Sequence, residues 1–307
     1  MAKFKKNQEN EVITDGSRAI NKFRISDAVM MAIVAILCAT CVLPFLHLAA
    51  KSVSSDTAVL AKRVTLYPIG FTLEAYESIF SDGSMVRSMG FSVMVTLIFT
   101  VLGMVVCTCA AYPLSKRRLK GRSFFTFILM FPMYFGAGLI PSYLLFKQLN
   151  LLDTMWVLIL PLIYSPYNML IMKTFFQSSI PDSLEEAAFL DGASNFQILF
   201  QVVLPLSKPI IATLSLFYAV GRWNAYADNK YYIRSEGLKM IQYKLSQLVS
   251  SASEAQTAQL SEAQAVTSTP EVLQAACIMF VTIPIICIYP FVQKYFVKGV
   301  MVGAVKG

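Results

Sequence analysis

Six long runs of apolar residues constrain the fold of this chain more than any other feature of its sequence. They cover roughly residues 28–50, 88–112, 123–146, 155–177, 206–227 and 272–296. The hydrocarbon core of a bilayer requires about 20 predominantly apolar residues for each helix that crosses it. Because lipid offers no hydrogen-bond partner to an open backbone, each run is expected to be helical. The sequence therefore predicts an all-α integral membrane protein with six transmembrane helices.

The composition supports a membrane location. Of the 307 residues, 56% are hydrophobic and 14% are charged, whereas a soluble domain carries about 25% charged residues. The mean hydropathy is +0.59. The net charge of +8 does not indicate nucleic acid, because the basic residues gather at the ends of the apolar runs and no aromatic stripe lies among them. The first 27 residues are hydrophilic, so the first run starts too late for a cleaved signal peptide and is expected to be a retained span.

Lysine and arginine are unevenly distributed between the two sides of the predicted spans. Sixteen of the 26 fall in the N-terminal segment, the 113–122 loop, the 173–209 segment and the C-terminal tail. Since cytoplasmic loops carry the excess of positive charge, both termini are expected to be cytoplasmic. The predicted organisation is a cytoplasmic segment 1–27, a six-span domain 28–298 with a cytoplasmic loop at 181–209, and a cytoplasmic tail 299–307.

The cysteines and the single histidine predict neither a disulfide framework nor a metal site. Cysteines inside apolar runs usually behave as small hydrophobic residues. The Cys107-x-Cys109 pair lacks zinc-ligand spacing, and His47 has no partner histidine. The chain also has no Gly-rich phosphate-binding loop of the P-loop type, so it is not expected to hydrolyse ATP by itself. All six cysteines lie in apolar runs: Cys38, Cys41, Cys107, Cys109, Cys277 and Cys287.

Two loops on the predicted outer side are long enough to contain structure. In the first, Thr72 is expected to cap a short helix over LEAYESIF. The second, near residues 235–270, is rich in Ser, Ala, Gln and Thr, and it is either a solvated amphipathic helix or a mobile surface loop. Prolines interrupt the third, fourth and sixth runs. Such breaks belong either to a translocation pathway or to the packing of kinked helices.

The polar stretch 185–209, EEAAFLDGASNFQILFQVVLPLSKP, stands out from its oily surroundings. A helix is expected to begin just before it, because Ser183 with Glu186, or Asp182 with Glu185, has the spacing of a capping box. The helix is expected to end at the glycine of LDGA, since glycine adopts the left-handed cap conformation without strain.

This short helix is expected to meet a protein rather than the membrane. Its alanines allow a partner to approach the backbone closely, and Glu185, Glu186 and Asp191 can then face basic groups on that partner. Anionic lipid attracts Lys and Arg, whereas residues 182–200 contain acids and no bases.

The same stretch resembles the EAA loop of the membrane subunits of ABC importers. That loop reads Glu-Ala-Ala, three residues, Gly, nine residues, an aliphatic residue, one residue and Leu-Pro. The matching positions are Glu186-Ala187-Ala188, Gly192, Val202 and Leu204-Pro205, with Val202 in place of the usual isoleucine. Asp191, Ala193 and Pro209 match the carbohydrate-importing branch.

The resemblance extends beyond this loop. LYPIGFTLEAYESIF after the first run, RWNAYADNKYYI after the fifth and the tail YPFVQKYFVKGVMVGAVKG are similar to one subgroup of importer subunits. These are the LplC/YtcP-type permeases of carbohydrate uptake transporter family 1, which are MalG-like. Together the matching segments span nearly the whole chain from about residue 20.

The resemblance implies a type I ABC-importer permease that is not itself an enzyme. A coupling helix between the fourth and fifth spans would dock in a cytoplasmic ABC ATPase dimer, which would bind the ATP and Mg. The other implied partners are a second homologous permease, an extracytoplasmic sugar-binding lipoprotein, an oligosaccharide and the lipid of a bacterial plasma membrane. The residues implied to couple to the ATPase are Glu185, Glu186, Ala187, Ala188, Asp191, Gly192 and Ala193.

Aromatic and hydrogen-bonding side chains near the outer end of the fifth run are candidates for the sugar pathway. For Trp223 and Tyr226 the alternative is an interfacial aromatic belt, and for Arg222 it is a structural role near a membrane end. The candidates are Tyr218, Arg222, Trp223 and Asn224 in this run, with Tyr143 and Asn168 in the third and fourth runs.

Two other classes of function fit the sequence less well. An ion-coupled secondary solute carrier requires ionisable residues at mid-depth, and the central parts of the runs contain almost none. The sequence also lacks the internal repeat of many such carriers. A membrane enzyme or scaffold would have no paired His, Asp or Glu inside the spans with which to perform chemistry.

Overall fold

The computed structural model describes residues 25–258 and 270–304, and every regular element in those ranges is helical. The all-α prediction is therefore confirmed for the described chain. Most of the predicted segment 1–27, part of the second outer loop and the end of the predicted tail lie outside the described residues.

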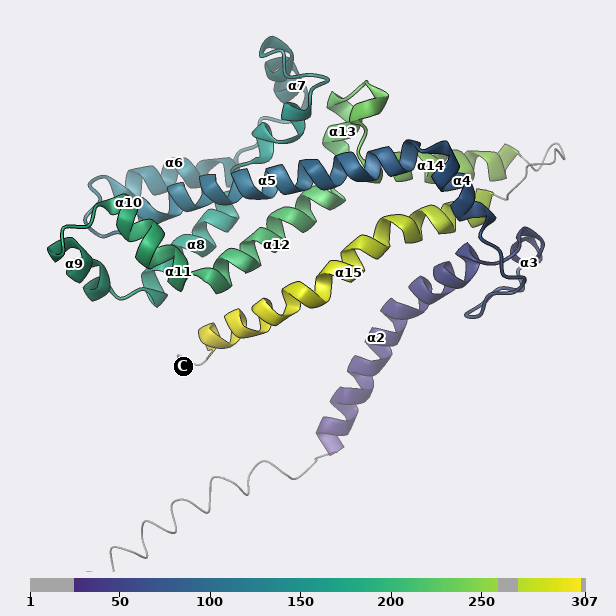
Figure 1. The fold of residues 1–307 in the computed structure, drawn as a ribbon, viewed down its shortest axis with the longest axis horizontal. Helices are drawn as coiled ribbons and strands as arrows, with labels where there is room; N and C mark the ends of the chain where they lie inside the picture. Colours follow the sequence, from purple (N-terminus) through teal and green to yellow (C-terminus); the bar gives the residue numbers. More distant parts are fainter. Residues whose placement is uncertain (1–24, 259–269, 305–307) are drawn as a thin grey trace, which may run out of the picture.

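Within the described residues, three helices are long and apolar enough to cross a membrane without a break. They are α2 (Ile25–Ser52), α5 (Ser84–Ser115) and α15 (Pro270–Ala304). Each of these helices starts within a few residues of the start of a predicted apolar run. The agreement is expected, because the length of a continuous apolar segment is what allows a helix to cross a bilayer. α5 runs along the length of the molecule, whereas α15 and α2 lie obliquely to it, α2 more steeply (Figure 1).

Breaks in the third and fourth predicted runs agree with the prolines that interrupt these runs in the sequence. The break at the start of the fifth run was not predicted, and α15 continues as one helix through Pro284 and Pro290. α6 (Arg122–Tyr134) and α7 (Leu139–Gln148) meet at 112°. The 3-10 turns at Met155–Leu158 and Leu160–Leu162 meet α8 (Pro166–Ser179) at 49°. The segment Asn195–Leu206 meets α12 (Lys208–Asn224) at 84°. Counting each bent pair as one span raises the number of spans from three to six.

The breaks have local causes. Gly138, at the start of α7, has a φ of +84°, a conformation that glycine adopts without the steric cost met by other residues. Pro166 at the first turn of α8 disfavours a helical conformation in the residue before it, and Ser165 is extended with φ −115° and ψ 109°. Ser165 then caps α8, because its hydroxyl accepts a hydrogen bond from the Asn168 N–H at 3.3 Å.

Shorter helices occupy the loops and the two ends of the molecule. They are α3 (Asp56–Leu60), α4 (Glu74–Asp82), α9 (Asp182–Leu190), α10 (Asn195–Ile198), a π-helical segment (Leu199–Val203), α11 (Leu204–Leu206), α13 (Ala227–Tyr232), a 3-10 turn (Glu236–Leu238) and α14 (Ile241–Ala258). α14 realises the helical alternative for the first part of the second outer loop.

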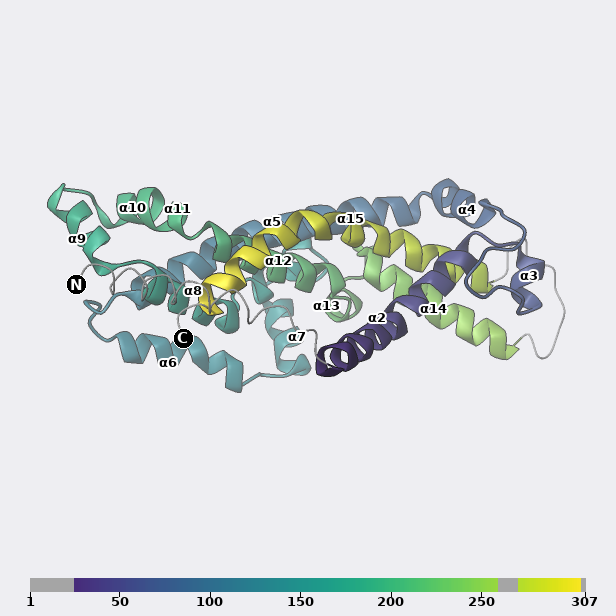
Figure 2. The ribbon, with the colours of Figure 1, turned by 90° about the horizontal axis from the view of Figure 1, so that it is seen from below.

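α5 is the centre of the packing, because both α8 and α12 lie against it. The α5–α12 contact is close at Gly103, where a Cβ atom would lie 2.7 Å from Cε1 of Tyr218. α15 packs against α2, α12 and α14. Figure 2 shows α6 at the edge of this arrangement, away from α12 and α15.

The molecule has two ends with different structure. We call them the α9 end, where α9 and α10 lie, and the α4 end, where α3, α4 and α14 lie (Figure 1). At the α4 end a second apolar cluster includes Ala75, Ile79, Trp223 and Ala276. Thr72 lies one residue further from α4 than expected, and its hydroxyl accepts a hydrogen bond from the Glu74 N–H at 3.3 Å.

Candidate functional site

α9 begins at Asp182, with Pro181 in the cap position and no side-chain cap. Both predicted capping boxes at this helix start are therefore wrong. Asp182 already has helical geometry, and Pro181, with φ −63° and an extended ψ of 135°, makes the turn into the helix. The carboxylates of Asp182 and Glu185 in the first turn still favour this end, because the exposed N–H groups of a helix start attract negative charge.

The end of α9 confirms the prediction for Gly192. Its φ is +84°, its N–H donates to the Phe189 carbonyl at 3.0 Å, and the Ala193 N–H donates to the Ala188 carbonyl at 3.0 Å. This pair of bonds is a Schellman motif, which requires a left-handed residue at the position of Gly192. No atom lies within 4 Å of a Cβ built there, so backbone conformation alone explains the glycine.

The next helix, α10, starts with a capping box that is not among the features predicted from the sequence. The Ser194 hydroxyl accepts from the Gln197 N–H at 3.4 Å, and the Gln197 side chain accepts from the Ser194 N–H at 2.8 Å. The Ser-x-x-Gln spacing in SNFQ is the signal that would have located it.

Basic residues of the 113–122 loop hold α9 against the rest of the chain. Lys116 forms an ion pair with Glu185, and the exposed fractions of the two side chains are 11% and 6%. Arg118 lies over the Phe189 ring, 4.2 Å from its centroid, and donates to the Asn195 side chain at 2.6 Å. One loop therefore fixes both α9 and α10.

The position of Glu185 differs from the expectation that it faces a partner protein. Its carboxylate is buried inside this chain and paired with Lys116. The pairing was not visible in the sequence, because 69 residues separate the two positions.

The outer side of α9 is exposed. Glu186, Ala187, Asp191 and Gly192 are exposed, whereas Ala188 and Ala193 are half-buried. Leu190 is 90% exposed at the tip of the helix. Its side chain lies on the exposed side of α9 with the exposed acids Glu186 and Asp191. Leu190 is not among the residues predicted from the sequence.

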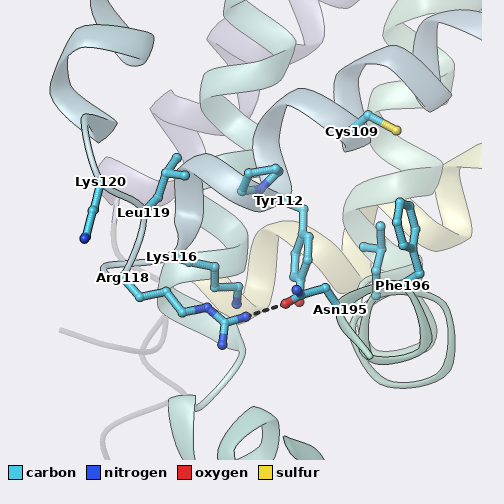
Figure 3. A pocket seen from close by; sticks show the side chains of 10 residues that line it. Cys109, Tyr112, Lys116, Arg118, Leu119, Lys120, Asn195 and Phe196 are labelled. Atoms are coloured by element: carbon cyan, nitrogen blue, oxygen red, sulfur yellow. Dashed lines mark hydrogen bonds between the residues drawn. The ribbon is translucent and has the colours of Figure 1, made fainter. Parts of the chain in front are cut away.

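Beside this loop lies a cavity of about 450 Å³ between the end of α5 and α10. Figure 3 shows Arg118 reaching from the 113–122 loop to Asn195, with Tyr112 and Phe196 nearby. The lining residues are Cys109, Tyr112, Pro113, Lys116, Arg118, Leu119, Lys120, Asn195, Phe196 and Leu199. Two of its three basic side chains, Lys116 and Arg118, already have partners in the chain.

The candidate sugar-path residues do not gather in one place, and several are occupied with packing. Arg222 is 1% exposed, donates to the Leu158 carbonyl at 2.8 Å and forms an ion pair with Asp228. It therefore joins α12 to the 3-10 turn before α8 and to α13. Trp223 is buried in the cluster at the α4 end, whereas Tyr226 is exposed, as an aromatic belt residue would be.

The remaining candidates are divided among three helices. Tyr218 and Asn168 are buried at the centre of the molecule, on α12 and α8. Tyr143 on α7 stacks with Tyr232 of α13 at 6.4 Å between ring centroids. Asn224 is exposed at the end of α12.

These features define a polytopic helical membrane protein that presents an anchored helix outside its apolar spans. Within the described residues, no cluster of three His, Cys, Asp or Glu side chains could hold a metal ion.

Comparison with known proteins identifies the class further. Residues 103–302 match the family described as "Binding-protein-dependent transport system inner membrane component". The chain is 42% identical to the polygalacturonan/rhamnogalacturonan transport system permease protein YtcP of Bacillus subtilis (strain 168), over 93% of this chain and 100% of the relative. It is 40% identical to Protein LplC of the same organism, over 87% of this chain and 90% of the relative.

A solved structure agrees with the two sequence relatives. A chain of a bacterial ABC transporter involved in the import of the acidic polysaccharide alginate matches with a TM-score of 0.80 and 32% identity, over 90% of this chain and 99% of that chain. The chain belongs to the binding-protein-dependent transport permeases and is a permease of the sugar ABC-importer family. An ion-coupled secondary carrier is thereby the weaker alternative.

Proposed function

We propose that this chain pairs with a second homologous permease and transmits the movements of a separate ABC ATPase dimer through α9. In this proposal the α9 end is cytoplasmic, and a sugar-binding lipoprotein delivers an oligosaccharide at the α4 end. The ATPase binds the ATP and Mg. The relative named for polygalacturonan and rhamnogalacturonan transport, and the solved structure of an alginate importer, support a fragment of a complex polysaccharide as the substrate.

The observation that carries the proposal is the division of α9 into a fixed side and a free side. Lys116 and Arg118 hold the helix through Glu185 and Phe189. The opposite side presents Ala187 and Leu190 without a partner in the described chain. If α9 is held in this way, it can transmit a push or pull to α5, because the residues that hold α9 directly follow the C-terminal end of α5.

The exposed leucine gives the first test. Burial of a leucine side chain contributes about 1.5–3 kcal/mol, so Leu190→Asp is expected to weaken ATPase binding by roughly tenfold or more. The measurement is co-purification in mild detergent of the tagged chain with the second permease and the ATPase. Leu66→Asp is the matched control, because Leu66 is also exposed but lies in the loop at the α4 end.

The expected pattern is specific to the proposed site. Leu190→Asp retains the second permease and loses the ATPase, whereas Leu66→Asp retains both. Full retention of the ATPase by Leu190→Asp would show that α9 does not carry the contact.

A further inference from the structure

A second cavity, of about 520 Å³, lies between α6 and α8. One face of α6 provides most of its lining, and α8 contributes a lysine. The lining residues are Arg122, Ser123, Thr126, Phe127, Met130, Tyr134 and Lys173. None of them belongs to the α9 contacts described above.

Lys173 in this cavity is a buried cation without a counter-ion. It is 8% exposed, and its ammonium donates to the Thr126 hydroxyl at 3.4 Å. No carboxylate of the described residues forms an ion pair with Lys173 or with half-buried Arg122. A buried charge is costly unless it is paired. The pair of cations therefore favours an anionic group between them, unlike Lys116 and Arg118, whose partners lie in this chain.

Polarity changes along the α6 face. Arg122, Ser123 and Thr126 lie at its start, next to the 113–122 loop at the α9 end, and Phe127, Met130 and Tyr134 continue toward the middle of the molecule. α6 has no buried residue and runs along the edge of the molecule (Figure 2). The cavity thus offers a charged and hydroxylated site at one end and an apolar surface at the other.

We propose that this cavity binds an anionic phospholipid of the inner leaflet. The phosphate lies between Arg122 and Lys173 and accepts hydrogen bonds from the hydroxyls of Ser123 and Thr126. An acyl chain lies along Phe127 and Met130. Basic pockets between membrane helices on the cytoplasmic side bind anionic lipid headgroups in this way. The inference rests on the orientation in the proposed function, with the α9 end cytoplasmic.

The change of polarity favours a lipid over an acidic oligosaccharide. A sugar chain carries hydroxyl groups along its whole length, and the apolar half of this surface would leave them without partners. A phospholipid carries its charge at one end and apolar acyl chains at the other, which matches the charged and apolar ends of the cavity.

The experiment is native mass spectrometry of the assembled importer, titrated with phosphatidylglycerol or with phosphatidylcholine. Arg122→Gln and Lys173→Met remove one charge each, and Lys208→Gln removes an exposed charge of the predicted cytoplasmic side outside the cavity. We expect phosphatidylglycerol to bind in preference to phosphatidylcholine. Each cavity variant is expected to reduce that binding roughly fivefold, and Lys208→Gln to leave it within about twofold.

Two results would overturn the proposal. One is equal binding of phosphatidylglycerol by the native chain, Arg122→Gln and Lys208→Gln. The other is displacement of the lipid by a soluble oligogalacturonide, which would assign the cavity to the sugar path. Arg122→Gln remains decisive if Lys173→Met fails to assemble, because Arg122 is only half-buried. Co-elution of the ATPase in the same preparations reports separately on the proposed function.

Discussion

At the scale of single residues, the contact between Lys116 and Glu185 is the most consequential in the described chain. Both side chains are nearly excluded from solvent, and they join the end of α5 to the first turn of α9. Removing one member of a buried ion pair leaves an uncompensated charge and costs about 3–5 kcal/mol, whereas replacing both members with apolar residues is often neutral.

This asymmetry predicts the behaviour of three variants. Glu185→Gln is expected to loosen α9, with a loss near 3 kcal/mol, and Lys116→Met with Glu185→Leu to recover most of it. Hydrogen–deuterium exchange of residues 182–193 measures the change. Equal protection in the native chain and in Glu185→Gln would show that the pair does not hold the helix. Glu186→Gln is the control, because Glu186 is next to Glu185 in the sequence but its carboxylate is exposed.

At the scale of elements, Asp153 connects the loop after α7 to the loop after α13. One carboxylate oxygen accepts from the backbone N–H groups of Arg234 and Ser235, at 2.9 and 2.8 Å, and the other accepts from the Ser235 hydroxyl at 2.6 Å. The Ser235 hydroxyl and N–H, followed by the Arg234 N–H, hold the pKa of Asp153 below its ordinary value. These bonds favour the ionised form.

The pH dependence of this connection follows from the direction of the shift. A lowered pKa in the folded chain adds stability that is complete above the unfolded value of about 3.9 and is lost as pH falls through the folded value. We expect hydrogen–deuterium exchange of residues 151–154 and 232–236 to rise below about pH 4, relative to neighbouring loops.

Asp153→Asn provides the matched variant. Asp153 has a φ of +57°, which asparagine tolerates, so the substitution removes the charge without adding backbone strain. The variant is expected to show raised exchange in both loops at neutral pH and little further change at acid pH. A native chain whose two loops stay protected at acid pH would contradict this account.

The elements also show what can be predicted from the sequence. The apolar runs predicted the positions of α2, α5 and α15 in the sequence, because hydropathy is enough to identify a long apolar helix. Gly192 of LDGA predicted the end of α9, because the left-handed backbone conformation needed there favours glycine whatever the surrounding packing. The prolines of the third run predicted a break between α6 and α7, but not its angle of 112°, because prolines permit a bend and packing decides its angle.

The candidate sites show the same difference between features set by the local sequence and features set by distant contacts. The α9 segment was predicted from local spacing, whereas the burial of Glu185 and Arg222 depends on partners distant in the sequence, Lys116 and Leu158. For the sugar path, residue type left alternatives open. Arg222 is buried at the centre of the molecule and Trp223 in the cluster at the α4 end, so the structure shows a packing role for both.

At the scale of the whole molecule, α5 packs on α8 and α12, the helices that carry the buried candidates Asn168 and Tyr218. Under the proposed function, a displacement at the Lys116–Glu185 contact would pass through α5 to these two helices.

The most direct test of this account is uptake of a labelled oligogalacturonide into proteoliposomes that contain this chain, the second permease, the ATPase and the binding protein. We expect uptake that requires enclosed ATP and is lost in Leu190→Asp, with no uptake driven by a proton or sodium gradient alone. Uptake that an ion gradient drives without ATP, and that Leu190→Asp leaves unchanged, would contradict it.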